Sequence, residues 1–300
     1  MRCLPAIDSR SLLALFLALS YAVNVSEAET LDVVTSISPL ASIVSELGGE
    51  KVSVSPLIAG ASDPHTFDLK PGDMKRLLAA KLLVFNGLGL EFWARGLSSD
   101  LRGKVFVMFD GPDGEQDEPE AAHEGHEHHH GAVDMHAWLD PLLVESRVEP
   151  LCQRMCQASP VNCPDFQARA GLFRQKLREL DAEIRTEVSS WQHNAFLAYH
   201  PAWSRFAKRY GLKQEGVMRH NDEVAPSIKG QVALLKKASE QHIGVLVVEP
   251  MTDVGRLASL MREGGLRPVT LDPLGQSGEA YAALMRRNLS SLAAAMKVSE

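Results

Sequence analysis

Short apolar runs alternate with segments of helical periodicity along most of the chain. In the first half, the runs with strand character are 31–36, 52–58, 82–85 and 105–109, and helical spacing marks 40–47 and 71–81. In the second half, strand-like runs at 195–199, 243–248 and 269–271 alternate with helical segments at 203–210, 228–241, 254–263 and 279–299. This alternation is typical of α/β folds in which helices flank a mostly parallel sheet.

One helical segment is much longer than the others. Residues 164–191 contain few helix breakers, and their apolar residues recur at three- and four-residue spacing to give one stripe: Leu172, Phe173, Leu177, Leu180, Ile184 and Val188. At 1.5 Å per residue this helix would be roughly 40 Å long. We therefore predict two α/β lobes joined by one rigid helix. The predicted boundaries are 29–163 for the first lobe, 164–192 for the linking helix and 193–300 for the second lobe.

The first 28 residues have the pattern of an export signal. Arg2 and Arg10 precede an apolar run at 11–23. That run is shorter than the about 20 residues of a membrane-spanning helix and within the about 7–15 residues of a signal-peptide core. Small residues at 26 and 28 predict cleavage after Ala28, and the mature protein is then expected in the periplasm. An uncleaved N-terminal anchor is the alternative interpretation.

The composition is globular and the charge balance is acidic. Hydrophobic residues make up 45% of the chain, and 31 Lys+Arg against 38 Asp+Glu give a net charge of -7. Such a chain can bury a large core. Nucleic acid is not expected as a partner, because phosphate binding needs a basic face.

Histidine is concentrated in a polar insert at 111–131. This insert is rich in Asp, Glu, His and Gly and almost lacks large apolar side chains, so it cannot build a core and we predict a mobile surface loop. Its imidazoles are His123, His126, His128, His129 and His130. Clustered imidazoles bind Zn²⁺, Cu²⁺ and Ni²⁺, so the loop is a candidate secondary metal-binding element. A solvated insert with incidental metal affinity is the alternative.

Three cysteines follow the export signal. Export to an oxidising compartment permits a disulfide, and an odd number leaves at least one thiol outside it. The pattern predicts a helix that ends near Ala158 and a new helix that begins near Pro164, so Cys163 could reach back to Cys156 or to Cys152. We favour Cys156 and keep Cys152 as the alternative partner. A structural disulfide is favoured over a zinc site, because no histidine is nearby to complete one.

Four residues outside the His-rich loop form a candidate metal site. His65, His136, His200 and Asp272 fall two in each predicted lobe, and three of the four come shortly after a strand. Ligand sites of parallel sheets gather at the carboxyl ends of the strands, so a cleft between the lobes could bring these residues together. Three imidazoles and one carboxylate make a tetrahedral set suited to zinc.

Several long motifs, in this order, resemble one known family. They are SISPLASIVSELGG (36–49), DPHTFDLKPGDMKRL (63–77), FNGLGLEFW (85–93), the His-rich loop, DMHAWLDP (134–141), YHPAWSRFAKRYGL (199–212), VVEP (247–250) and LDPLG (271–275). The chain is similar over nearly all of its mature length to the metal-specific solute-binding proteins of ABC importers. The likeness is greatest to the periplasmic zinc-binding ZnuA/AztC-type group of the cluster A-I family.

This resemblance implies a two-lobed receptor with zinc held between the lobes by His65, His136, His200 and, where a carboxylate completes the site, Asp272. Manganese-type relatives carry a carboxylate at the position of His200, so a histidine there favours zinc. Some zinc-binding members have a glutamate beside the first histidine, where this chain has Pro64. Asp272 or water is then left as the fourth ligand.

The implied function is capture of Zn²⁺ and its delivery to an ABC permease with a cytoplasmic ATPase. A monomer is expected, and a periplasmic metallochaperone as a further partner is left open. A periplasmic zinc buffer that works through the His-rich loop is the alternative function. A zinc hydrolase is disfavoured, because no HExxH motif is present and Glu249 is the one candidate for a general base.

Overall fold

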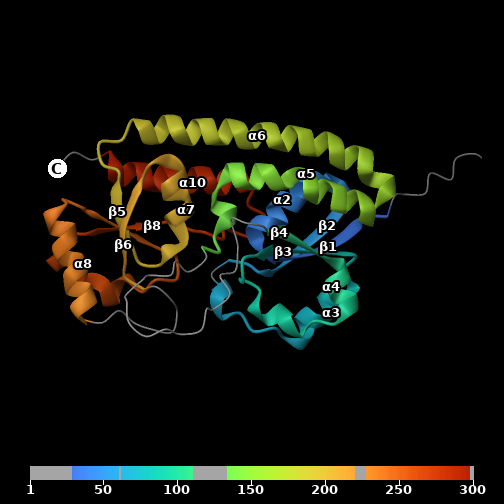
Figure 1. Ribbon diagram of the computed structural model, residues 1–300, viewed down its shortest axis with the longest axis horizontal. Coiled ribbons are helices and arrows are strands. Elements are labelled where there is room, and N and C mark those ends of the chain that lie inside the picture. The colour runs from blue at the N-terminus through green and yellow to red at the C-terminus, as the bar shows by residue number, and fades with distance from the viewer. Residues whose placement is uncertain (1–28, 61, 111–133, 220–227, 298–300) are drawn as a thin grey trace, which may run out of the picture.

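A computed structural model of the chain describes residues 29–60, 62–110, 134–219 and 228–297. The predicted export signal and the His-rich loop with His123, His126, His128, His129 and His130 lie outside the described residues, so both remain predictions. Figure 1 shows two α/β halves side by side, with one long helix, α6, running along both. The predicted fold class is therefore confirmed.

Each half contains a four-stranded parallel sheet. The first sheet consists of β1 (Leu31–Ile37), β2 (Val52–Ile58), β3 (Leu82–Gly87) and β4 (Val105–Phe109), in the order β2-β1-β3-β4. The second consists of β5 (Ala195–Ala198), β6 (Lys213–Val217), β7 (Val245–Val248) and β8 (Arg267–Thr270), in the order β6-β5-β7-β8. The two sheets thus have the same topology.

The helices connect the strands and cover the sheets. They are α2 (Ser38–Gly48), α3 (Pro71–Ala79), α4 (Ser99–Lys104), α5 (Pro141–Ala158), α6 (Cys163–Ser189), α7 (Ser204–Tyr210), α8 (Ile228–Glu240), α9 (Ala258–Glu263) and α10 (Tyr281–Met296). Within the described parts of the chain, none of them combines the length and apolar character needed to cross a membrane. Helix α6 lies where the linking helix was predicted, and the exact lobe boundaries stay a prediction.

The two halves share one continuous apolar core. Helix α6 packs against α5, α2 and α10, and the buried cluster joins residues of both sheets to these helices. Most of the predicted stripe of α6 is buried in it, from Phe173 to Val188, but Leu172 is 63% exposed, so its assignment to the stripe was wrong. Leu172 is one residue, or about 100°, away from Phe173 around the helix, which turns it to solvent. A shared core of this size restrains movement of one half against the other.

Hydrogen bonds cross between the halves beside this core. Ser38 Oγ donates to the carbonyl oxygen of Leu274 at 2.7 Å, and the indole Nε1 of Trp138 donates to the carbonyl oxygen of Pro273 at 2.7 Å. The hydroxyl of Tyr281 donates to the carbonyl oxygen of Trp138, also at 2.7 Å. Trp138 is fully buried, so these bonds fix the segment that follows His136 against the second half.

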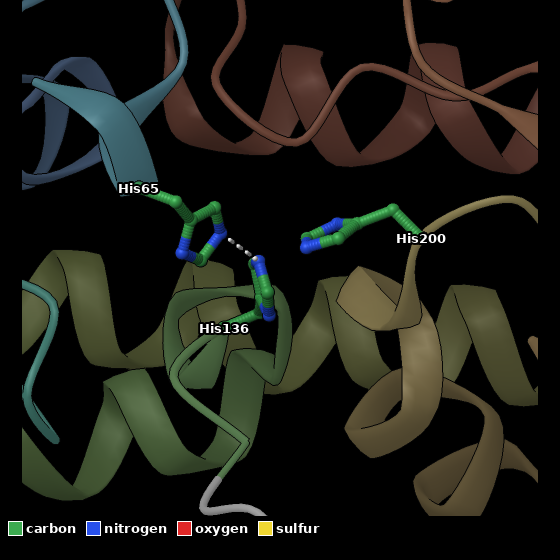
Figure 2. Close-up of side chains that lie close together, drawn as sticks. All are labelled: His65, His136 and His200. Atoms are coloured by element: carbon green, nitrogen blue, oxygen red, sulfur yellow. Dashed lines mark hydrogen bonds between the residues drawn. The ribbon is translucent and has the colours of Figure 1, made fainter. Parts of the chain in front are cut away.

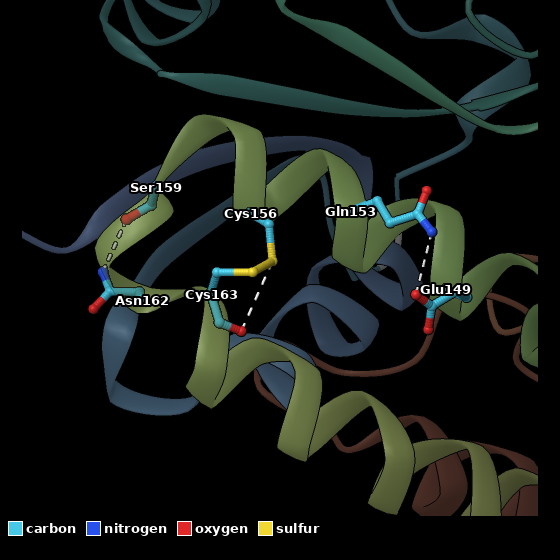
Figure 3. The surroundings of a disulfide bond; sticks show 6 residues. All are labelled: Glu149, Gln153, Cys156, Ser159, Asn162 and Cys163. Atoms are coloured by element: carbon cyan, nitrogen blue, oxygen red, sulfur yellow. Dashed lines mark hydrogen bonds between the residues drawn. A yellow bond between two sulfur atoms is a disulfide. The ribbon is translucent and has the colours of Figure 1, made fainter.

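A disulfide joins the end of α5 to the start of α6. Figure 3 shows the bond between Cys156 and Cys163, which confirms the favoured pairing. Within the turn that it closes, the side-chain amide of Asn162 donates to Ser159 Oγ at 2.9 Å. Cys152 is buried one turn earlier on α5, and burial raises the pKa of its thiol to about 11. This thiol is therefore protonated at neutral pH and unreactive.

Candidate metal centre

The strand order places the candidate residues at the carboxyl edges of the two sheets. In each sheet the strand order reverses between the two central strands, which are β1 and β3 in the first sheet and β5 and β7 in the second. Parallel sheets bind ligands at such topological switch points. His200 and Glu249 come within two residues of the ends of β5 and β7. His65 lies in the short 3-10 turn Pro64–Thr66 after β2, and His136 immediately precedes the turn Ala137–Leu139.

The three histidines converge from separate segments. One ring nitrogen from each of His65, His136 and His200 lies within 4.8 Å of the others, and the ring centroids are 5.0 to 5.2 Å apart. Figure 2 shows the three rings facing a common space, with Nε2 of His65 3.2 Å from Nε2 of His136. Burial, followed by the neighbouring His136 and His200, lowers the pKa of His65 to about 4. Its imidazole is therefore neutral at pH 7, as a metal ligand must be.

Local hydrogen bonds fix the backbone at two of these histidines. Asp63 Oδ1 accepts from the backbone N–H of His65 at 2.8 Å, which closes the turn that contains the buried Pro64. Asp134 Oδ1 accepts from the backbone N–H of His136 at 3.0 Å. An aspartate two residues before the histidine thus holds the ligand segment in both places, and less freedom remains to be lost on binding.

Two carboxylates orient two of the three imidazoles through their Nδ1 atoms. Asp134 Oδ1 lies 3.0 Å from Nδ1 of His136, and Glu249 Oε1 lies 2.9 Å from Nδ1 of His200. Burial alone would raise the pKa of the Glu249 carboxyl, but the hydrogen bond with His200 and the nearby imidazoles lower it overall. An ionised carboxylate at Nδ1 holds the proton there and leaves Nε2 of the same ring as an acceptor for a metal.

The segment with His136 is also held by α7 of the second half. The backbone N–H of Arg205 donates to Asp134 Oδ2 at 3.2 Å, and its Nε donates to the carbonyl oxygen of Asp134 at 3.1 Å. Arg209 forms a two-pronged ion pair with Asp140, with donor–acceptor distances of 2.6 to 3.0 Å. Asp140 in turn caps α5. His136 therefore lies at a junction that both halves stabilise.

Asp272 lines the same cavity but stands apart from the three imidazoles. The cavity has a volume of about 620 Å³, and its walls include His65, His200 and Asp272. Asp272 Oδ1 accepts from the backbone N–H groups of the two residues at 274 and 275, and its Oδ2 accepts from Arg287 at 3.1 Å. Within the described residues, the compact group of possible ligands holds the three histidines without Asp272.

This arrangement can hold a borderline-soft transition metal ion. Three imidazole nitrogens at the spacing seen here suit Zn²⁺, Cu²⁺ or Ni²⁺ better than Mg²⁺ or Ca²⁺, which prefer oxygen ligands. A fourth coordination position would face the cavity, where Asp272 lies. The site collects possible ligands from both halves, so it is a candidate binding centre between them.

Comparison with known proteins identifies the family. A family model described as "Zinc-uptake complex component A periplasmic" (ZnuA) matches residues 33–295. The chain belongs to this family. The resemblance inferred from the sequence motifs is thereby confirmed.

Relatives of this ZnuA family member are similar over most of its length. The high-affinity zinc uptake system protein ZnuA of Yersinia pestis is 26% identical over 286 residues, which cover 89% of each chain. The zinc-binding protein AdcA of Streptococcus pyogenes serotype M3 is 26% identical over 306 residues, and these cover 94% of this chain. The chain spans 59% of the length of that streptococcal relative.

Solved structures of the same family share the fold. A crystal structure of ZnuA has a TM-score of 0.75 at 24% identity and covers 89% of this chain and 99% of the other. A zinc-bound variant of AdcAII from Streptococcus pneumoniae has a TM-score of 0.75 at 24% identity, with coverage of 90% and 100%. At this identity the likeness establishes the architecture of two lobes and a long helix.

The sequence of this ZnuA family member did not reveal the orienting carboxylates. Asp134 was not singled out, and Glu249 was considered only as a general base. Both residues carry a local signal in retrospect, because Asp134 stands two residues before His136 and Glu249 follows the apolar strand β7. Asp134 is 2 residues from His136, whereas Glu249 is 49 residues from His200. The pairing of Glu249 with His200 therefore depends on the sheet order rather than on local sequence.

Proposed function

We propose that this protein is a periplasmic zinc receptor that captures Zn²⁺ in the cleft and delivers it to an ABC permease with its ATPase. The observation that carries the proposal is the convergence of three imidazoles whose ring nitrogens lie within 4.8 Å of one another. Family membership and relatives named for zinc binding or zinc uptake support it. Export with cleavage after Ala28 belongs to the same proposal.

The proposed zinc ligands are His65, His136, His200 and Asp272. Asp134 and Glu249 orient two of the imidazoles, which supports ligation through Nε2. Asp272 lines the cavity that His65 and His200 also line, and its Oδ2 accepts a hydrogen bond from one side chain, Arg287, so this oxygen is available to a bound ion once the arginine gives way. Three nitrogens and one oxygen complete a closed tetrahedral zinc site, as expected for binding rather than catalysis.

The proposal predicts that tight zinc binding resides in the cleft. After removal of residues 115–131 from the mature protein, we expect one zinc ion to remain tightly bound, because His65, His136 and His200 belong to the folded body. A competitive titration against a zinc chelator measures this. The full-length mature protein is the control.

Loss of tight binding after this deletion would instead favour the zinc-buffer function of the His-rich loop. Adding His200→Gln to the deletion variant separates the two cases. Without the loop, any tight zinc site that remains must lie in the cleft. If the cleft binds zinc, the second substitution should remove the remaining tight site.

Replacing Glu249 with glutamine should weaken zinc binding by about tenfold. The glutamine keeps the size of the side chain but removes the charge that holds the proton on Nδ1 of His200. The affinity is measured by chelator competition at pH 7.5. Glu240→Gln is the matched control, because Glu240 pairs with Lys236 on exposed α8. Unchanged affinity in both Glu249→Gln and Glu249→Ala would show that this carboxylate does not support the site.

A further inference from the structure

Arg287 of α10 lies on the cavity wall, between Asp272 and the carboxylate of Glu279, which is not part of the cavity lining. Its Nη2 is 3.1 Å from Asp272 Oδ2 and 2.8 Å from Glu279 Oε2, and its Nε is 2.9 Å from Glu279 Oε1. Both Arg287 and Asp272 line the cavity that His65 and His200 also line. The arginine is thus a cation placed against the carboxylate proposed as the fourth zinc ligand.

The two oxygens of Asp272 are held very differently. Oδ1 accepts two backbone N–H groups, from Leu274 at 3.0 Å and from Gly275 at 2.9 Å, and these bonds close a rigid turn. Oδ2 accepts only a side-chain donor, Arg287, among the hydrogen bonds given by the described residues. Ligation of a metal by Oδ2 could therefore keep both backbone bonds. It would require the arginine to give way and Asp272 to come closer to the imidazoles, because Asp272 lies outside their compact group.

The backbone of Asp272 is fixed by the neighbouring residue of α10. Asn288 accepts from the backbone N–H of Asp272 at 2.8 Å and donates to its carbonyl oxygen at 2.7 Å, and Asn288 is buried. Helix α10 therefore holds the main chain with Asn288 and the carboxylate with Arg287. The Asp272 side chain is 14% exposed, whereas that of Arg287 is 38% exposed and can move toward solvent while it stays paired with Glu279.

We propose that Arg287 is an internal competitor of zinc for Asp272. In the metal-free protein the guanidinium occupies Oδ2, and on zinc binding this oxygen passes from Arg287 to the ion. Loss of the bond between Arg287 and Asp272 reduces the net affinity for zinc. When zinc leaves, the guanidinium binds the Asp272 carboxylate again. The competition thereby sets how readily the receptor gives up its cargo. This inference rests on the proposed role of Asp272 as a zinc ligand.

The direction of the change in zinc affinity shows whether Arg287 competes with zinc or supports the zinc site. Replacing Arg287 with glutamine should tighten zinc binding by about fivefold, at the upper end for a partly exposed ion pair, and should slow zinc dissociation by a similar factor. A residue that merely stabilises the site would weaken binding when it is lost. Chelator competition gives the affinity, and stopped-flow transfer of zinc to an excess of chelator gives the dissociation rate.

A double-mutant cycle tests the route through Asp272. Asp272→Asn alone should weaken zinc binding, and adding Arg287→Gln to it should give no gain. Arg286→Gln is the matched control: it removes the same charge from the adjacent position, where Arg286 pairs with Glu183 outside the cavity, and it should leave the zinc affinity unchanged.

Three results would overturn the proposal. These are no gain in affinity with Arg287→Gln, a gain of equal size in the Asp272→Asn background, and unchanged affinity with Asp272→Asn alone. The last result would remove Asp272 from the ligand set and leave the three-histidine centre untouched. Thermal unfolding checks that each variant is folded. Should Arg287→Gln fail to fold, Arg287→Met decides, because it also removes the charge and the Nη2 donor to Asp272 and should likewise tighten binding.

Discussion

Replacing His136 with alanine should weaken zinc binding by more than about 100-fold, beyond the range expected for loss of an orienting residue. His136 is the most enclosed of the three histidines, at 5% exposure, and its ring lies 5.2 Å from that of His65 and 5.0 Å from that of His200. Its loss removes one ligand and leaves the Asp134 carboxylate without the imidazole that it orients. Competition with a high-affinity chelator at pH 7.5 measures the change.

His193 offers a matched control for this substitution. It lies in the segment before β5, at the opposite end of the strand from His200, and it belongs to a separate pocket with His242. His193→Ala should leave the zinc affinity within twofold of the unmodified protein, or about 0.4 kcal/mol. Equal affinities of the His136→Ala variant and the unmodified protein would refute the cleft as the zinc site.

The fold followed from the sequence because its buried strands are strongly apolar. Strands such as β1 and β7 are buried along nearly all of their length, and their apolar composition predicts them as strands. Strand β6 was not predicted, because it has the polar sequence KQEGV and, among the strands of the described part of the chain, pairs with β5 alone at the edge of the sheet. Its position is set by tertiary pairing, which local composition does not record.

The site was predictable where ligands follow strands and unpredictable where side chains meet over long sequence separations. The rule that parallel sheets bind ligands at their carboxyl edges selected His65 and His200. His136 follows the polar insert rather than a strand, and the structure brings all three histidines together. The same rule selected Asp272 but could not show that Arg287, 15 residues later, occupies one of its oxygens. That contact depends on how α10 packs against the sheet.

The shared core and the cleft have connected roles. The apolar cluster joins both halves through α6 and thereby restrains the two halves that carry the three imidazoles. A preformed site loses little conformational freedom on binding, which favours tight capture. Under the proposed function, release would require a local change at a ligand, and Asp272, the proposed fourth ligand, has Arg287 as an alternative partner in the structure.

The zinc-free protein should lose stability as the pH falls from about 6.5 to about 4, and His65 should account for about 3 kcal/mol of this loss. Burial, followed by His136 and His200, lowers the pKa of His65 from 6.5 to about 4 in the folded protein. Above pH 6.5 the imidazole is neutral in both states. Between the two values the unfolded chain binds a proton that the folded protein does not, so acid favours unfolding. Below pH 4 both forms are protonated and this contribution no longer changes.

His65→Gln isolates this contribution, because it removes the titrating ring and keeps every other group. Burial raises the pKa of Glu91, which acts in the opposite direction, and the carboxylates of Asp134 and Glu249 have lowered pKa values that matter mainly below about pH 4.5. The effects of Glu91 and Asp134 cancel when the two proteins are compared. The effect of Glu249, whose pKa depends in part on His65, is confined mainly to the lowest pH. Urea unfolding of both, without zinc, at pH 7.5, 6.0, 5.0 and 4.2 should give free energies of unfolding that converge or cross as the pH falls. Parallel curves over this range would mean that burial and the neighbouring histidines do not hold His65 neutral, and zinc would then compete with protons at His65 near its ordinary pKa.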